Sequence, residues 1–466
     1  MNIFFGAGKL GKKYYIFWRE CGIALDYFAD NNPTLWYKRI EGIEVIPPEK
    51  LKDFTENLNI LITCRDWEPI WLQLKELGMR DYQIKVCNTT MGMLTALRYL
   101  PSLQLPLKTP DDSQRKVLFL LDFGLTLGGV EFWSLNTAKK LRELGWNAHL
   151  LLSNETQATM SECEDEYMIK AVCTENLTEW EKLVCLIAPM LQYRSIICNF
   201  AGGYNLMAAS LIKKSFQMKY RVIAVIHNDE EEYYQSYMDA EPYLDKCLII
   251  SNKMGTEMIK RGFPKEKLMY LPWKISCNDF FSHCYSQQNE PLRIGYAGRV
   301  VIAQKRSDLL LTVAKKLEER GIDFRMEIAG TGSYEEELRL QIQTAGLENK
   351  ARCLGMLKDV RLFWLRQDIM ITCSEWEGHS ISQCEAMAAG AVPIITDTSG
   401  ARDDVEDGIN GYIVNIGDID HIVERICYLY SHREQLPILG ERAHKTILER
   451  NKACDFQKLW ESILLS

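Results

Sequence analysis

Several common signatures are missing from this sequence of 466 residues. It has no C-x-x-C pair and no H-E-x-x-H motif, so it indicates no zinc centre, and we predict no metal site. No stretch reaches about 18 uninterrupted apolar residues, which argues against a membrane-spanning helix. The N-terminal MNIFFGAGKLG does not resemble a signal peptide, because its apolar run is short and no cleavage site follows. We therefore expect a cytoplasmic protein.

An excess of positive charge is also absent. The 55 Lys and Arg residues are outnumbered by 63 Asp and Glu, which gives a net charge of −8. Nucleic-acid-binding domains usually carry a basic surface, so we predict no nucleic-acid partner. The 15 cysteines are odd in number and lie mostly in apolar runs, as buried thiols in a reducing compartment do. A hydrophobic content of 47% suffices for a sizeable core.

What the sequence does contain is one local pattern that occurs three times. A short apolar strand, a glycine-containing turn and an amphipathic helix follow one another in residues 2–23, 116–145 and 292–321. This order is typical of parallel α/β domains. The continuous apolar strands indicate sheets that are covered on both faces. We predict an α/β protein of three doubly wound units.

Polar and proline-containing segments mark the boundaries between these units. The segment LPSLQLPLKTPDDSQRK contains three prolines and a charge cluster, and SCNDFFSHCYSQQNEP is a second polar stretch. The predicted parts are a small N-terminal domain (1–103), a linker (104–115), a middle domain (116–275), a hinge (276–291) and a C-terminal domain (292–466).

Two cations of the C-terminal domain lie where open parallel sheets bind their ligands. Arg299 ends the first strand of this domain, and Lys305 precedes the next helix. Ligands gather at the carboxyl edge of such sheets, so both cations are placed for a diphosphate. The alternative is a solvated loop with two ordinary surface cations.

A glycine turn follows the next strand. Gly330 and Gly332 bracket it, and Ser333 is the expected N-cap of the following helix. Glycines permit a sharp strand-to-helix turn whether or not a ligand binds there, so this motif alone has little weight.

Two glutamates flank the start of a later helix. Ser382 and Glu385 have the spacing of a capping box, which by itself explains Glu385. The alternative is that Glu385 binds sugar or ribose hydroxyls beside the free N–H groups of the helix. Glu377 lies in the preceding loop and has no capping role. It is therefore the stronger candidate for a ligand contact.

In this order, the motifs closely resemble the donor-binding half of family 4 glycosyltransferases with the GT-B fold. That family has a G-R-x(n)-K segment, an I-x-G-x-G turn and an E-x7-E motif. Here they read GR followed by Lys305, IAGTG, and EGHSISQCEAMAAGAVP. The later segment DTSGARDDVEDGINGYIV also matches the family pattern. The resemblance implies two Rossmann-like domains in residues 116–466, with the final helix crossing back to the middle domain.

The resemblance also implies roles for individual residues of the C-terminal domain. Arg299 and Lys305 would neutralise the nucleotide diphosphate, and the backbone amides of Ser380 and Ile381 would contact its phosphate or sugar. The nucleotide and its ribose would be held at Glu385, Gly330 and Gly332. Glu377 would face the donor sugar as a catalytic residue. His379 stands where the family often has E-G-F-G, and we expect it to hydrogen-bond the sugar.

The middle domain carries two further matches. The LGGVE segment resembles the family's G-G-(A/V)-E loop, so Gly128 and Gly129 would bring backbone amides to the diphosphate. His227 ends a strand where family members place a histidine near the reacting carbon, and it would act in catalysis. A plain turn and a backbone-bonded histidine are the structural alternatives. The family's P-N-G-(V/I)-D loop is replaced here by PWKI.

The N-terminal segment contains a different motif, G-x-G-x-x-G. Gly6, Gly8 and Gly11 follow a strand and open a helix, and Asp30 ends the next strand. This segment resembles small Rossmann-like domains that are attached to sugar-modifying enzymes. It would bind a nucleotide ligand, either a dinucleotide or a nucleotide sugar, or else serve only in assembly.

The resemblance favours a retaining, metal-independent transferase that needs no cofactor and uses a nucleotide-diphosphate sugar as donor. No convincing D-x-D is present. The acceptor would be a carbohydrate or a lipid-linked molecule in polysaccharide or glycoconjugate synthesis, with peripheral membrane association left open. Two alternatives remain. One is a non-catalytic nucleotide-sugar-binding regulator or scaffold, and the other is an oxidoreductase based on the N-terminal glycine motif.

Overall fold

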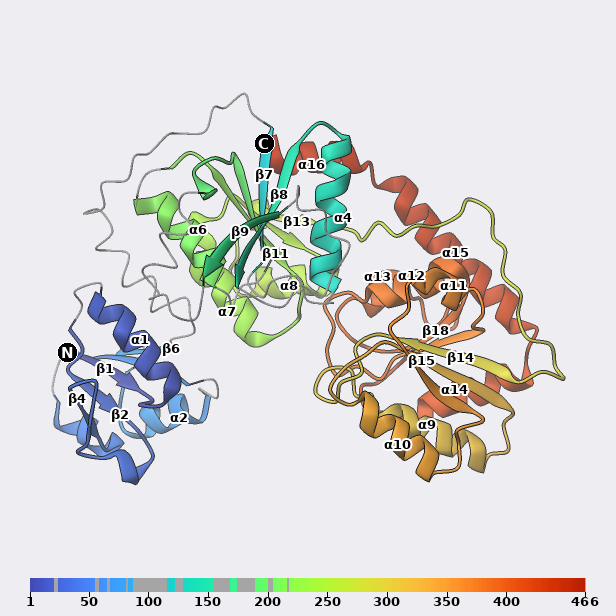
Figure 1. The fold of residues 1–466 in the computed structure, drawn as a ribbon, viewed down its shortest axis with the longest axis horizontal. Helices are drawn as coiled ribbons and strands as arrows, with labels where there is room; N and C mark the ends of the chain where they lie inside the picture. Colours follow the sequence, from blue (N-terminus) through green and yellow to red (C-terminus); the bar gives the residue numbers. More distant parts are fainter. Residues whose placement is uncertain are drawn as a thin grey trace. The chain divides into compact units, whose positions relative to one another are not determined.

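The computed structural model describes eleven stretches of the chain: residues 1–20, 24–54, 58–64, 68–80, 83–86, 115–121, 129–154, 168–173, 189–199, 204–215 and 218–465. The chain divides into two compact units. One comprises Met1–Val225 and Glu231–Cys247, and the other comprises Ile226–Glu230 and Leu248–Ser466. The described strands form three sheets that are parallel almost throughout, as Figure 1 shows. The predicted α/β class is confirmed.

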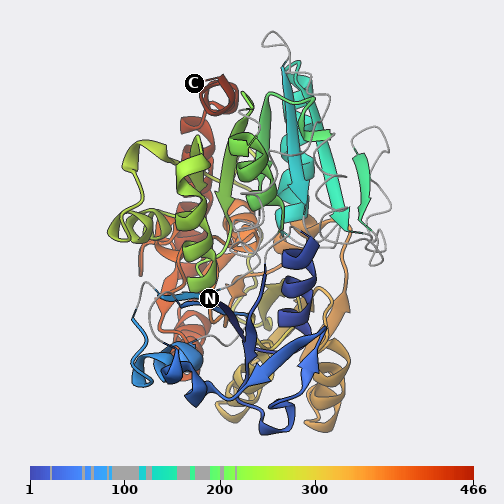
Figure 2. The ribbon, with the colours of Figure 1, turned by 90° about the vertical axis from the view of Figure 1, so that its left-hand side faces the viewer.

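The first sheet has the strand order β3-β4-β2-β1-β5-β6, and only the β3–β4 pair is antiparallel. Trp18 packs α1 against the sheet, with its ring edge-on to Phe4 at 4.7 Å between centroids. Figure 2 shows this helix in dark blue beside its strands. The elements are β1 (Asn2–Phe5), α1 (Lys9–Glu20), β2 (Tyr27–Ala29), η1 (Pro33–Leu35), β3 (Arg39–Ile40), β4 (Ile43–Ile46), η2 (Pro48–Asp53), β5 (Asn59–Ile62), α2 (Glu68–Glu76) and β6 (Ile84–Val86).

The second sheet has the order β13-β12-β11-β10-β7-β8-β9. The pairs β11–β10, β10–β7, β7–β8 and β8–β9 are parallel, and the apolar β7, β10 and β11 are almost completely buried. The elements are β7 (Lys116–Leu121), α4 (Gly129–Glu143), β8 (Asn147–Asn154), β9 (Met168–Cys173), β10 (Ser195–Cys198), α6 (Tyr204–Ser215), β11 (Arg221–Ile226), α7 (Glu231–Ala240), η6 (Glu241–Tyr243), β12 (Lys246–Ile249), α8 (Asn252–Lys260), η7 (Lys265–Lys267) and β13 (Leu268–Tyr270).

The third sheet is parallel throughout, in the order β16-β15-β14-β17-β18-β19. Figure 1 shows α9, α10 and α14 on one face and α11, α12 and α15 on the other. Its elements are β14 (Leu292–Ala297), α9 (Asp308–Glu319), β15 (Phe324–Ala329), α10 (Glu335–Thr344), β16 (Ala351–Gly355), α11 (Val360–Trp364), β17 (Ile369–Ile371), α12 (Ile381–Ala389), β18 (Val392–Thr396), α13 (Ala401–Asp404), β19 (Tyr412–Val414), α14 (Ile419–Ser431), α15 (Gln435–Ala453) and α16 (Phe456–Leu465).

Helices on both faces explain why β17, β18 and β19 are nearly continuous apolar runs, whereas β15 and β16 also carry charged residues. Every residue of β17, β18 and β19 is buried. A strand with water on one face would instead alternate apolar and polar residues. The prediction that α16 crosses back to the middle domain stays a prediction. In the described part of the chain, no helix combines the length and the apolar character that crossing a membrane requires.

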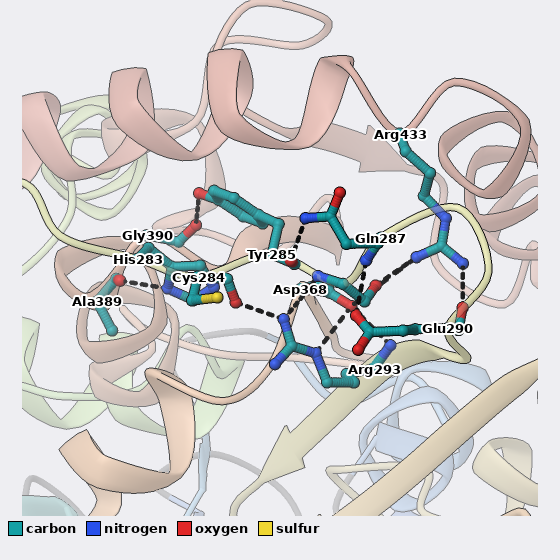
Figure 3. Close-up of polar contacts among 11 residues, drawn as sticks. His283, Cys284, Tyr285, Gln287, Glu290, Arg293, Asp368, Ala389, Gly390 and Arg433 are labelled. Carbon is teal, nitrogen blue, oxygen red and sulfur yellow. Dashed lines mark hydrogen bonds and ion pairs between the residues drawn. The ribbon is translucent and has the colours of Figure 1, made fainter.

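Part of the predicted hinge, residues 276–291, is bound to the third sheet (Figure 3). Asp368 precedes β17 and is fully buried. Its carboxylate accepts from the backbone N–H of Ser286 at 2.8 Å and from the Arg293 guanidinium at 2.6 Å. The hydroxyl of Tyr285 donates to a carbonyl at the C-terminus of α12 at 2.6 Å. The second half of this segment is therefore fixed to the same unit as the third sheet.

Candidate functional site

The strand order of the third sheet points to one place for a ligand. From β14 the chain adds β15 and β16 on one side and then returns to add β17 on the other. Ligands of open α/β sheets bind outside the carboxyl ends of the strands where the order reverses. Here that place lies between the loops that follow β14 and β17. These loops carry the predicted Arg299, Lys305 and Glu377.

Gln304 joins these two loops. Its side-chain oxygen accepts from the Arg299 guanidinium at 2.6 Å, and its side-chain nitrogen donates to the carbonyl of Trp376 at 3.2 Å. Its backbone carbonyl accepts from the N–H of Glu375 at 2.8 Å. Gln304 thus orients Arg299 and fixes the loop of Glu377 at the same time. Gln304 was not predicted as a site residue, because no local pattern shows that two loops about 70 residues apart meet.

Lys305 and Glu377 form an ion pair. The Lys305 ammonium donates to Glu377 Oε1, and the hydroxyl of Ser374 donates to the same oxygen at 2.8 Å. The two charged side chains are only 17% and 11% exposed. The structure therefore brings these two predicted residues together. Arg299, whose side chain is exposed, extends from the same loop as Lys305.

The glycine turn after β15 is required by close backbone packing. A Cβ on Gly330 would lie 1.9 Å from the carbonyl oxygen of Gly298, and one on Gly332 would lie 2.3 Å from that of Val300. Gly330 also has a φ of +123°, which side-chain-bearing residues rarely adopt. These glycines allow the loop after β15 to support the loop that carries Arg299. Their predicted nucleotide contact stays a prediction.

Helix α12 is capped by Ser380. Its Oγ accepts from the N–H of Gln383 at 3.3 Å. The expected capping box between Ser382 and Glu385 is wrong, because the helix begins at Ile381 and Ser382 lies inside its first turn. The predicted cap at Ser333 is also wrong, since Tyr334 occupies the N-cap of α10. The predicted contacts of the Ser380 and Ile381 amides with phosphate stay predictions.

The corrected cap gives a testable difference between two neighbouring serines. Ser380→Ala should lower the free energy of unfolding by about 1 kcal/mol, because an N–H of the first turn loses its acceptor. Ser382 Oγ is buried and has no hydrogen-bond partner among the described residues. Ser382→Ala should therefore leave the free energy of unfolding unchanged or raise it slightly. Chemical denaturation of both variants measures the difference, and equal losses would contradict the assignment.

Glu385 lies in the second turn of α12 with a partly exposed side chain. Burial raises the pKa of its carboxyl to about 7. Its carboxylate accepts no hydrogen bond within the described part of the chain. A carboxylate that neither caps the helix nor pairs with a cation is chemically suited to a ligand. Because the capping explanation no longer holds, the case for ligand binding is stronger than the sequence indicated.

His227 directly follows β11 and is buried. Burial lowers the pKa of its imidazole to about 3, so the ring is neutral near pH 7. A Cβ on Gly378 would lie 2.0 Å from the His227 carbonyl oxygen, so glycine is needed next to Glu377 for this close approach. The structure thus places His227 against the loop of Glu377. Its catalytic role stays a prediction.

His379 does not have the environment that a sugar contact requires. Its side chain is 0% exposed. Nδ1 lies 3.0 Å from the carbonyl oxygen of Ile250, and Nε2 lies 2.6 Å from Asp404 Oδ2. Because both ring nitrogens already have internal partners, the expectation that His379 hydrogen-bonds the donor sugar is corrected. A local sequence pattern could not show this, because the partners are distant in the chain.

The glycines predicted in the middle domain are only partly described. Gly128 lies outside the described residues. Gly129 is the first residue of α4. The diphosphate contact of both residues stays a prediction.

In the N-terminal sheet, two of the three motif glycines are required by packing. Gly6 has a φ of +115°, and a Cβ there would lie 2.5 Å from Cys64 Sγ. A Cβ on Gly11 would lie 1.9 Å from the carbonyl oxygen of Gly6. Gly8 has open space around it, since a Cβ there would have no described atom within 4 Å. Close packing of strand and helix therefore explains Gly6 and Gly11 without a ligand.

Asp30 is already used within this sheet. One carboxylate oxygen accepts from the N–H of Ala7 at 2.7 Å, and the other accepts from the N–H of Asn32 at 2.8 Å. Its carboxylate therefore stabilises the glycine turn and the chain after β2, and the predicted ligand contact of Asp30 stays a prediction. Nucleotide binding by the N-terminal domain stays a prediction that rests on Gly8 and the motif alone.

Comparison with known proteins bears on the part of the chain that contains this site. Residues 285–446 match the family model described as Glycosyl transferases group 1. Over this segment the chain is similar to the glycosyl transferases of group 1. The segment contains the loops after β14 and β17, and with them Arg299, Lys305, Glu377 and Glu385.

Relatives of the chain include two curated bacterial proteins. The chain is 22% identical over 279 residues to poly(ribitol-phosphate) alpha-N-acetylglucosaminyltransferase of Staphylococcus aureus. The aligned region covers 58% of the chain and 55% of that protein. It is 30% identical over 149 residues to the putative glycosyltransferase EpsD of Bacillus subtilis. That aligned region covers 32% of the chain and 39% of EpsD. The chain thus spans about half the length of the curated relatives it matches.

Among solved structures, HepE of Anabaena in complex with UDP and glucose is similar, with a TM-score of 0.63 at 17% identity. The match covers 76% of this chain and 100% of HepE. This likeness confirms the predicted GT-B fold for the part of the chain that it covers.

Proposed function

We propose that the chain is a retaining, metal-independent glycosyltransferase that moves a sugar from a nucleotide-diphosphate sugar to a carbohydrate or lipid-linked acceptor. One observation carries the proposal. A nearly buried Lys305–Glu377 pair lies beside the exposed Arg299 at the strand-order reversal of the segment that is similar to the glycosyl transferases of group 1. Two cations and a carboxylate together suit a ligand that joins a diphosphate to a sugar.

In this proposal, the leaving diphosphate is stabilised by positive charge that already lies at the site. Arg299 and Lys305 supply two positive charges, and the N-terminus of α12 adds N–H groups that favour an anion. Donors fixed in advance towards developing charge are commonly the largest contribution to catalysis. Lys305 would turn from Glu377 to the diphosphate, which would leave Glu377 to accept from sugar hydroxyls.

The remaining roles follow from the same placement. Glu385 would accept hydrogen bonds from the ribose hydroxyls. His227, held neutral by burial, would orient the donor sugar. Retention would result from attack of the acceptor hydroxyl on the face from which the diphosphate departs. The acceptor proton would then pass to the departing phosphate oxygen.

The test is a donor screen with the whole chain. UDP-, GDP- and ADP-sugars are incubated separately, and release of the nucleoside diphosphate is measured with and without EDTA. We expect one donor class to be turned over, at a rate that EDTA does not change, and NMR of the product to show the donor's anomeric configuration. Loss of activity with EDTA would contradict metal independence, and an inverted product would contradict retention. Tight donor binding without turnover would instead support a nucleotide-sugar-binding regulator.

A further inference from the structure

A buried polar cluster lies directly behind the proposed donor site and has no part in the mechanism above. It consists of His379, Cys384 of α12, Asp404 of α13 and Arg450 of α15. Asp404 Oδ2 lies 2.6 Å from His379 Nε2 and 3.3 Å from Cys384 Sγ. Asp404 Oδ1 lies 2.5 Å from the Arg450 guanidinium. Three side chains, those of His379, Cys384 and Arg450, therefore meet at one carboxylate.

His379, Cys384 and Asp404 are also a combination of residue types that binds metal, and their donor atoms lie within 4.8 Å of one another. Two features favour hydrogen bonds instead. The 2.6 Å between Nε2 and Oδ2 is a hydrogen-bond length, whereas two ligands of a tetrahedral zinc ion lie about 3.3 Å apart. The Arg450 guanidinium, 3.5 Å from Cys384 Sγ, would place a second cation next to the ion.

The geometry also indicates the charge state of His379. Each ring nitrogen faces an oxygen acceptor, the Ile250 carbonyl or the Asp404 carboxylate, so both nitrogens must carry a proton. Burial alone lowers the pKa of His379, but Cys384 and Asp404 outweigh it and raise the pKa above its ordinary value. Burial alone raises the pKa of Asp404, but His379 and Arg450 outweigh it and hold the pKa below its ordinary value. The cluster is therefore a buried ion pair near pH 7.

The backbone around His379 is packed as closely as its side chain. A Cβ on Gly400 would lie 2.7 Å from the carbonyl oxygen of Gly378 and 2.8 Å from the Cα of His379. On the other side of the loop, Gly378 touches the carbonyl of His227. A shift of His379 would therefore move Gly378, and with it the neighbouring Glu377.

A second set of contacts holds Ile250, the other partner of His379, in place. The residue after it, Ser251, caps α8 and shares a hydrogen bond of 2.9 Å with the hydroxyl of Ser399. The N–H of Asn252 donates to Asp403 at 2.9 Å. The segment from Ile250 is thus fixed to the chain around α13, and His379 bridges the two.

We propose that His379 is a positioning residue: by binding Ile250 and Asp404 together, it fixes the loop that carries Glu377 and Ser380 against the strand end at His227. This inference rests on the proposed function, because Glu377 and His227 are the groups that would face the donor sugar. His379 touches no substrate in this arrangement. It acts by setting the distance between groups that do, and a displacement of about 1 Å can cost an enzyme about 100-fold in rate.

The kinetic test compares His379→Asn, Asp404→Asn and the double variant with the parent, using the donor that the screen selects. Each measurement is made where denaturation curves show the variant to be folded. We expect His379→Asn to lower kcat about 10-fold or more while the donor KM changes less than about 2-fold, since orientation is lost and binding is not. The double variant should lose no more than the larger single loss, because both changes break one contact.

The matched control is His432→Asn. His432 lies in the same unit and is exposed, and its Nδ1 lies 2.9 Å from the carbonyl oxygen of Tyr428, four residues earlier in the chain. The variant should retain the parental kcat and KM. The positioning role would be overturned if folded His379→Asn kept the parental kcat. It would also be overturned if the loss of kcat in the double variant equalled the product of the two single losses.

Amide hydrogen exchange separates this inference from the proposed function. In His379→Asn, amides 375–381 should exchange faster than in the parent, while those of α14 should not change. Unchanged exchange at 375–381 would overturn the positioning role. This readout needs no turnover, so it still applies if the protein turns over no donor and the proposed function fails. One equivalent of zinc retained after dialysis by the parent, and lost in His379→Asn, would also overturn it by making the cluster a metal site.

Discussion

Glu385→Gln should weaken the binding of the donor nucleotide by about 10-fold or more and also make the protein more stable above pH 7. The loss of affinity is expected because a carboxylate accepts hydrogen bonds from ribose hydroxyls more strongly than an amide does. The gain in stability is expected because burial raises the pKa of Glu385 to about 7. Above pH 7 the folded protein therefore holds an ionised Glu385 carboxylate in a buried environment that disfavours the charge, and the amide of the variant carries no such charge.

The dependence on pH follows from that pKa. In the unfolded chain, Glu385 loses its proton near its ordinary pKa of 4.5, and in the folded protein it does so only near 7. The folded state thus binds more protons in between, so its stability falls as pH rises from about 4.5 to 7 and stays lower above. At pH 8, Glu385→Gln should be more stable than the parent by at most about 3 kcal/mol. At pH 4 the two should be equal.

Two measurements check this prediction. Denaturation curves at pH 4 and pH 8 give the difference in stability, and calorimetric titration with UDP between pH 6 and 8 gives the affinity. If the screen selects another base, its diphosphate replaces UDP. The terminal phosphate of UDP also ionises in this range, so affinity should rise more steeply with pH in the parent, where Glu385 ionises too, than in the variant. Equal affinity of parent and variant at pH 8 would contradict the ribose contact.

Lys305→Ala should be the most damaging single substitution in the proposed site. It leaves the Glu377 carboxylate, 11% exposed, without its cation. Removing one partner of a buried ion pair typically costs about 3–5 kcal/mol, so the free energy of unfolding should fall by about 3 kcal/mol. Transfer activity should fall by about 100-fold or more, because the leaving diphosphate loses a fixed positive charge.

A double variant separates the two effects. Lys305→Met with Glu377→Gln leaves neither charge buried, so the free energy of unfolding should return towards the parental value. Activity should stay lost, because the cation is still missing. Lys316→Ala is the control, since Lys316 pairs with Asp420 on the surface and should change neither property appreciably. Parental activity in the stable double variant would exclude Lys305 from the chemistry.

The order of secondary-structure elements could be predicted because its signals are local. Strands β17 and β18 are nearly continuous apolar runs, and such runs indicate strands covered on both faces. Glycines such as Gly330 mark the sharp turns between strand and helix. Neighbouring residues determine both signals, so the α/β class and the edge of the sheet that carries the site could be predicted without coordinates.

The errors within the site have a different origin. The capping box at Ser382 has the right spacing, but the spacing does not reveal that the loop after β17 ends at Ser380, two residues earlier. Asp30 follows a nucleotide-binding motif, and no local pattern shows that its carboxylate also accepts from the N–H groups of Ala7 and Asn32. In each case, the packing of the surrounding loops determines which side chain caps the helix or which groups the carboxylate contacts, and the local sequence does not contain that information.

The sequence by itself determined the strand-and-helix order, the type of sheet, and the presence of two cations and two glutamates at one sheet edge. Only the tertiary structure decided how these residues are used. It paired Lys305 with Glu377, left Glu385 without a partner among the described residues, and buried His379 between Ile250 and Asp404. The physical reason is distance along the chain. Periodicity and turn chemistry act over a few residues, whereas the partner of a charge is set by which distant segments pack together.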